Sequence, residues 1–192
     1  MSAGDALAAL LAERFGDAFR DRRAELAREF RTEPPLRYGG WHAVRYLCLH
    51  HTAGPTTGYN ATYEGIWNLH VKRMGWSGPG YGTFVYPDGR VDVGVGPERI
   101  TWGVWGRYAE VHNVCTPGNY TRDTPSAVQL NAIYVVLCAL DDLYGGAGRP
   151  WRGHRELTLP GHGTACPGAL LKHLESMRRL GAVTPRPARY AA

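Results

Sequence analysis

The sequence has no apolar run long enough to cross a membrane. Its longest stretch of consecutive apolar residues, 132–140, is far shorter than the roughly 20 residues that a spanning helix needs. The first residues also differ from a secretory signal, because no cationic head comes first. Asp5 precedes the apolar residues, and Glu13, Arg14 and Asp17 interrupt them. We therefore expect a protein without a membrane span that is cytoplasmic when it is made.

Cysteine is scarce, and the four cysteines lack the close spacings of a disulfide scaffold. Cys48, Cys115 and Cys138 lie in apolar stretches, where a cysteine is expected to be a small buried side chain. Cys166 differs, because Pro167 and two small residues surround it in a turn-like segment. It is the cysteine that we expect to take part in chemistry.

Lysine is also rare, and the formal net charge is only +5. The positive charge is concentrated from residue 170 to the end, a segment with five lysine or arginine residues and one acidic residue, Glu175. The basic residues of this segment are Lys172, Arg178, Arg179, Arg186 and Arg189. Because the rest of the chain is close to neutral, we expect no nucleic-acid partner. A basic tail could favour an anionic bacterial envelope, and a solvated, frayed terminus would have the same composition.

Helix-like and strand-like segments alternate along the chain. Residues 5–30 carry apolar side chains at three-to-four-residue spacing and predict one N-terminal helix, which a Pro- and Gly-containing linker at 31–40 follows. Further helices are expected at 62–75, 126–145 and 169–180, and strands within 43–54, 80–95 (a hairpin) and 110–116. This pattern predicts an α/β fold, with a central mixed β-sheet flanked by α-helices and an extra N-terminal helix.

The length of 192 residues suits one domain with a substantial core. We expect an N-terminal helix and linker at 1–36, a catalytic domain at 37–180, and a basic Pro/Arg tail at 181–192 that is flexible.

Histidines occur at the end of the first predicted strand, at His50 and His51, and again near Cys166. Zinc prefers imidazole nitrogen and thiolate sulfur, and a catalytic zinc takes three protein ligands. Successive side chains on a strand face opposite ways, so only one residue of the first pair can enter a shared pocket. In the later segment both His154 and His162 are candidates, although a histidine in a turn is more often a surface residue than a ligand.

Three motifs, in this order, resemble the zinc-dependent N-acetylmuramoyl-L-alanine amidases, a family that includes phage lysozyme-type amidases and peptidoglycan recognition proteins. The motifs are LHHTAG at 49–54, GWSGPGYGTFVYPDGRV at 75–91 and GHRELTLPGHGTACPG at 153–168. The resemblance covers roughly residues 37–180. Any one of these motifs alone would be a weak match, but their order makes the combination specific.

The resemblance implies that His50, His154 and Cys166 bind Zn²⁺, and that Tyr81 and Thr164 are catalytic. His51 would then point away from the metal. His162 remains an alternative ligand, because it lies only four residues before the cysteine. The GHRE surroundings favour the first histidine of the segment, and His162 would then line the substrate groove.

The resemblance further implies hydrolysis of the bond between N-acetylmuramic acid and the L-alanine of the stem peptide. Trp102 and Trp105, in the segment TWGVWG, are candidates for packing against sugar rings. The expected partner is peptidoglycan, and the expected state is a monomer. The favoured biological role is a phage-type endolysin that lyses bacterial cell walls.

Three alternatives stay open at this point. The chain could be a cytosolic amidase that recycles muropeptides, or a peptidoglycan-binding module without activity. In the third alternative Cys166 is a thiol nucleophile with His154 as its base, as in cysteine peptidases. Activity that survives chelation and is lost on alkylation would favour that last chemistry.

Overall fold

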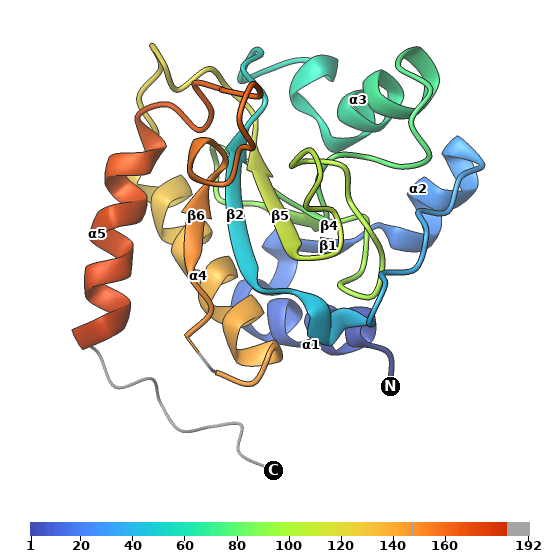
Figure 1. Ribbon diagram of the computed structural model, residues 1–192, viewed down its shortest axis with the longest axis horizontal. Coiled ribbons are helices and arrows are strands. Elements are labelled where there is room, and N and C mark those ends of the chain that lie inside the picture. Colours follow the sequence, from blue (N-terminus) through green and yellow to red (C-terminus); the bar gives the residue numbers. More distant parts are fainter. Residues whose placement is uncertain (147, 184–192) are drawn as a thin grey trace.

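The computed structural model describes residues 1–146 and 148–183, which form a six-stranded sheet with helices on both faces (Figure 1). The strand order is β1-β4-β3-β5-β2-β6, and every neighbouring pair is parallel except β3 with β4. The strands are β1 (Phe19–Asp21), β2 (Tyr46–His51), β3 (Thr83–Val85), β4 (Val91–Val93), β5 (Val111–Thr116) and β6 (Trp151–Gly153). The helices are α1 (Ala3–Phe15), α2 (Arg23–Phe30), α3 (Tyr63–Trp67), α4 (Ala127–Leu143) and α5 (Leu170–Val183). The predicted mixed α/β architecture is confirmed.

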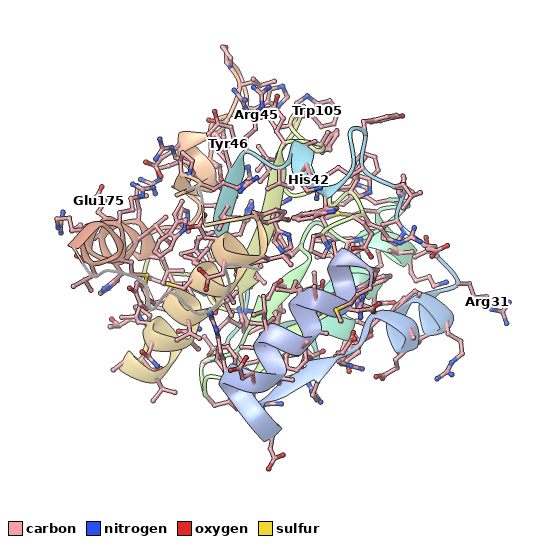
Figure 2. All side chains as sticks on the ribbon, turned by 90° about the horizontal axis from the view of Figure 1, so that it is seen from below. Arg31, His42, Arg45, Tyr46, Trp105 and Glu175 are labelled. Atoms are coloured by element: carbon pink, nitrogen blue, oxygen red, sulfur yellow. The ribbon has the colours of Figure 1, made fainter. Side chains whose placement is uncertain are left out.

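The two faces of the sheet carry different layers. Helices α1, α4 and α5 cover one face, where Leu47, Leu49 and Val114 join the largest core cluster. The opposite face carries α2, α3 and long loops, and Figure 2 shows Trp105 on the side of the sheet away from α1. Because side chains alternate along β2, His50 points to this second, loop-covered face.

Strand β2 lies between β5 and β6, and its register decides which residues meet at the end of the sheet. His50 is paired with Cys115 on one side, and Leu49 is paired with Gly153 on the other. His154 follows β6 directly and opens a short 3-10 turn, His154–Glu156. Two histidines far apart in sequence therefore lie at the carboxyl ends of neighbouring parallel strands, where α/β sheets bind ligands.

The prediction of one helix over 5–30 was wrong. Helix α1 ends at Gly16, which has a φ of 51°, and β1 then pairs with β4 before α2 begins. Arg20 on β1 donates two hydrogen bonds of 2.8 Å to the carboxylate of Asp92, which is fully buried. The apolar spacing continues across the break, but pairing with a distant strand outweighs this local pattern.

The other predicted elements are found, with two differences. Ser126 caps α4 by accepting a hydrogen bond of 3.0 Å from the Gln129 amide, and the predicted hairpin consists of β3 and β4. The helix expected at 62–75 begins as α3, continues as a π-helix, Asn68–Arg73, and stops before Gly75. Strand β6 was missed, because three residues after a Gly-rich segment carry no alternating pattern of their own.

No described helix is both long and apolar enough to span a bilayer. Of the expected basic tail at 181–192, only the backbone of 181–183 belongs to the described residues, as the end of α5.

Arg37 fastens the loop that precedes β5. Its guanidinium is buried and donates hydrogen bonds of 2.8 to 3.1 Å to the carbonyl groups of five residues. These residues are Pro97, Arg99, Tyr108, Ala109 and Val111. The loop between them contains the TWGVWG segment, so one buried cation holds both ends of the loop that carries the two tryptophans.

We expect Arg37→Met to lower the free energy of unfolding by roughly 3–5 kcal/mol, because it leaves buried carbonyl groups without donors. Denaturant titration of both proteins measures the difference. The matched control is Arg45→Met, at an exposed arginine (Figure 2), which we expect to change stability by no more than about 0.5 kcal/mol. Equal stability of the two variants would contradict this role of Arg37.

Candidate functional site

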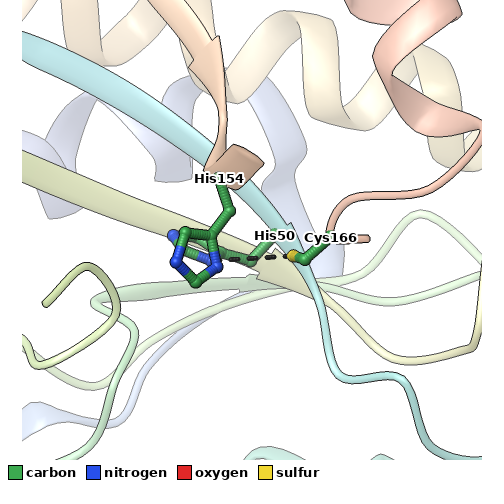
Figure 3. A group of neighbouring side chains, drawn as sticks. All are labelled: His50, His154 and Cys166. Atoms are coloured by element: carbon green, nitrogen blue, oxygen red, sulfur yellow. Dashed lines mark hydrogen bonds between the residues drawn. The ribbon is translucent and has the colours of Figure 1, made fainter. Parts of the chain in front are cut away.

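Three side chains with metal-binding atoms converge on the loop-covered face of the sheet. His50 comes from the end of β2, His154 from the turn after β6, and Cys166 from the turn before α5 (Figure 3). One donor atom of each lies within 4.8 Å of the donor atoms of the other two, and the Nδ1 of His50 is 3.9 Å from the Sγ of Cys166. Among the described residues, no other group of three such side chains is this close. His162 is outside this group.

The ring of His50 is held from behind by a polar side chain. Its Nε2 lies 2.8 Å from Oδ1 of Asn113 on β5, and Nδ2 of Asn113 donates to Oγ1 of Thr101 at 2.8 Å. Nε2 of His50 therefore points toward Asn113, and Nδ1 points toward Cys166 and His154.

Several hydrogen bonds hold the turn that carries Cys166. The Sγ of Cys166 accepts from the His51 amide at 3.3 Å, and the Cys166 amide donates to Oγ1 of Thr164 at 3.1 Å. Arg155, next to His154, donates its amide to the Cys166 carbonyl at 2.9 Å and its guanidinium to the Ala165 carbonyl. The GHRE turn and the cysteine turn are thus tied directly to each other.

His51 takes the position that strand alternation predicts. Its Nδ1 accepts a hydrogen bond of 2.9 Å from the Tyr120 amide, away from the His50 ring. It contributes to the site through its backbone, by the contact with the Cys166 sulfur.

Burial controls the protonation of the three converging groups. It lowers the pKa of His50 well below its usual range and that of His154 to about 4, so both rings are neutral at pH 7. Burial also raises the pKa of Cys166 to about 12, against the opposing effects of the His51 amide and the Arg155 charge. Two neutral imidazoles and one thiol that can ionise on binding are a donor set that fits zinc.

Tyr81 lies beside these residues, with its ring centroid 5.1 Å from that of His50. Burial raises the pKa of Tyr81 well above its usual value, and the thiols of Cys115 and Cys166 add to the effect. The phenol is therefore neutral at pH 7, so Tyr81 can donate a hydrogen bond but is not a base. The ring of His70, from the π-helix, packs edge-on against it with centroids 5.6 Å apart.

A cleft of about 750 Å³ opens above His154. Its lining residues are Trp76, Ser77, Trp102, Gly103, Trp105, Tyr108, His154, Thr158, Leu159, His162 and Gly163. Trp105 is 62% exposed and stacks on His162 with centroids 5.6 Å apart and planes at 19°. Trp102 packs edge-on against Tyr108. No lysine, arginine or carboxylate is among these lining residues.

Several residues that build the site could not be recognised from the sequence. Arg155 lies inside a quoted motif, but nothing in the motif shows which turn it would hold. Asn113 and Thr101 lie in an apolar strand and an aromatic loop, and their role depends on pairing between segments far apart in the chain. The sequence signal of His70 is weak: it is a polar residue on the apolar side of its helix, where it is buried.

Comparison with known proteins agrees with this geometry. The family model for N-acetylmuramoyl-L-alanine amidase matches residues 40–169, which is more than half of the chain. The solved Ph2119 endolysin, from the Thermus scotoductus MAT2119 bacteriophage Ph2119, has a similar fold, with a TM-score of 0.67 and 26% identity. That similarity covers 83% of this chain and 98% of the endolysin.

Two curated relatives are similar in sequence. The N-acetylmuramoyl-L-alanine amidase of Sus scrofa is 33% identical over 162 residues, which are 77% of this chain but only 26% of the pig protein. Peptidoglycan-recognition protein SC1a of Drosophila melanogaster is 29% identical over 138 residues, or 65% of this chain and 68% of that protein. From the family match and the converging site, we conclude that the chain belongs to the N-acetylmuramoyl-L-alanine amidase family.

Proposed function

We propose that the protein is a zinc-dependent amidase that hydrolyses the bond between N-acetylmuramic acid and the L-alanine of the stem peptide. The observation that carries this proposal is the convergence of His50, His154 and Cys166, of which His154 also lines a cleft of about 750 Å³. When bound there, zinc would supply a Lewis acid for the amide carbonyl and an acidic water for the attack.

Tyr81 and Thr164 are the proposed catalytic residues of the chain. The neutral Tyr81 phenol can donate a hydrogen bond to the reacting oxygen or orient the attacking water. Oγ1 of Thr164 already accepts from the Cys166 amide, and the same hydroxyl can still donate its hydrogen toward a developing oxyanion. Neither side chain is charged, so these two residues position the reacting groups rather than neutralise them.

The walls of the cleft are proposed to bind the sugar part of the substrate. Sugar rings have apolar faces that pack on flat aromatic side chains, and Trp105 with His162 presents such a surface. Because His162 lies outside the donor group and in this wall, we assign it to substrate binding rather than to the metal.

Lysis of bacterial cell walls is the biological role that we favour, because the chain matches nearly the full length of the Ph2119 endolysin. The basic residues near the C-terminus would help it to reach an anionic envelope. A second candidate function is recognition of peptidoglycan without cleavage, which the similarity to peptidoglycan-recognition protein SC1a supports. A muropeptide-recycling amidase would act on small soluble fragments only.

Chelation separates these possibilities. We expect purified peptidoglycan to lose turbidity in the presence of the protein, to stop doing so after zinc is removed, and to resume when zinc is restored. Activity that survives chelation and disappears on alkylation would indicate the cysteine-nucleophile chemistry instead. Binding to the wall without turbidity loss in any state would favour the recognition function.

Substitution of the two candidate histidines tests the ligand assignment. His154→Ala removes a donor, so we expect zinc to be lost and activity to fall about a thousandfold, equivalent to several kcal/mol of transition-state stabilisation. His162→Ala is the matched control and should retain one zinc per chain. Metal analysis and turbidity assays measure both effects, and zinc loss in the His162 variant alone would reverse the assignment.

Trp105→Ala tests the sugar-binding wall. The stacking surface contributes equally to bound substrate and transition state, so we expect KM to rise about threefold to tenfold with little change in kcat. Tyr59→Ala is a control at a similarly exposed aromatic residue outside the cleft. Kinetics on soluble glycan-containing fragments give both constants, and an unchanged KM would remove Trp105 from the proposed binding surface.

A further inference from the structure

We propose that Asn113 is a positioning residue that selects the metal-binding nitrogen of His50, and that Thr101 sets the orientation of the Asn113 amide. This inference rests on the proposed zinc centre. It concerns three buried polar side chains that are hydrogen-bonded in sequence: Thr101 in the loop that contains TWGVWG, Asn113 on β5, and His50 at the end of β2.

The orientation of the Asn113 amide follows from its partners. The amide nitrogen lies 2.8 Å from Oγ1 of Thr101 and 3.4 Å from the Thr101 carbonyl oxygen. A carbonyl can only accept hydrogen bonds, so the NH₂ group of Asn113 must face Thr101 and the amide oxygen must face His50. Asn113 is 1% exposed, so its side chain is shielded from bulk water.

The orientation of the amide determines the tautomer of His50. Oδ1 of Asn113 lies 2.8 Å from Nε2 of His50, and an amide oxygen has no hydrogen to give. The hydrogen must therefore be on Nε2, and the neutral ring carries its lone pair on Nδ1. That nitrogen lies 3.9 Å from the Cys166 sulfur, on the side where the donor atoms converge. In the other tautomer a hydrogen would occupy the direction of the metal.

The backbone at Gly103 packs closely against the Asn113 side chain. A Cβ atom at Gly103 would lie 2.7 Å from Cγ of Asn113 and 2.5 Å from the Gly80 carbonyl oxygen. Only glycine lets the loop pass this close, and the same loop carries Trp102 and Trp105 to the cleft. The wall of the cleft and the first metal ligand are therefore held by one side chain.

The experiment measures zinc affinity by competition with a chromogenic chelator in four proteins. Asn113→Leu keeps the approximate size but removes the acceptor, and we expect zinc to bind about 10- to 100-fold more weakly. Asn113→Asp retains an acceptor oxygen and should restore the wild-type affinity or exceed it. Thr101→Val removes one of the two contacts to the amide nitrogen and should give a smaller loss than Asn113→Leu.

A second measurement requires no substitution. Nitrogen-15 spectra of the zinc-free wild type should show the His50 hydrogen on Nε2, and Thr101→Val should increase the other tautomer. A hydrogen on Nδ1 in the wild type, or unchanged zinc affinity in a folded Asn113→Leu protein, would overturn the inference alone. A wild type that binds no zinc would overturn the metal centre and this inference together. If Asn113→Leu does not fold, the inference is tested by the wild-type spectrum and by the spectrum and zinc affinity of Thr101→Val.

Discussion

Parallel pairing of β2 with both β5 and β6 is the constraint on which the rest of the site depends. It aligns Leu49 with Gly153, so that the chain leaves β6 at the level of His50 and places His154 beside it. A shift of one residue would send His50 to the helix-covered face. Gly153 also contributes by its lack of a side chain, because a Cβ atom there would lie 2.8 Å from Pro167 in the cysteine turn.

The site combines a densely hydrogen-bonded group of metal-binding side chains with a cleft wall that includes an irregular turn. Nε2 of His50 is hydrogen-bonded to Oδ1 of Asn113, the Cys166 sulfur accepts from the His51 amide, and Arg155 donates to the carbonyl groups of the turn that carries Cys166. The wall at His162 is different, since the residue lies between two exposed glycines of a turn outside the regular elements. The proposed zinc would need donor atoms held in fixed positions, whereas the proposed polymeric substrate would have to enter and leave the cleft.

The fold class and the converging residues could be predicted from the sequence, because strand periodicity and the GHRE and TACPG motifs are local patterns. The break at Gly16 and the short strand β6 could not, since both are stabilised by pairing with distant strands. For the same reason Asn113 carried no signal: it is one polar residue in an apolar strand until β2 and the cleft loop lie against it. Motif context favours His154 over His162 as a ligand, and in three dimensions only His154 belongs to the donor group, although both residues line the cleft.

Strand β1 has a further consequence for the behaviour of the protein in solution. It covers the free edge of β4 and becomes the outer strand of the sheet, but it is only three residues long and ends in Arg20 and Asp21. A short edge with charged side chains offers few backbone groups to a strand of another molecule. The N-terminal segment therefore limits edge-to-edge aggregation through the β1 edge of the sheet at high protein concentration.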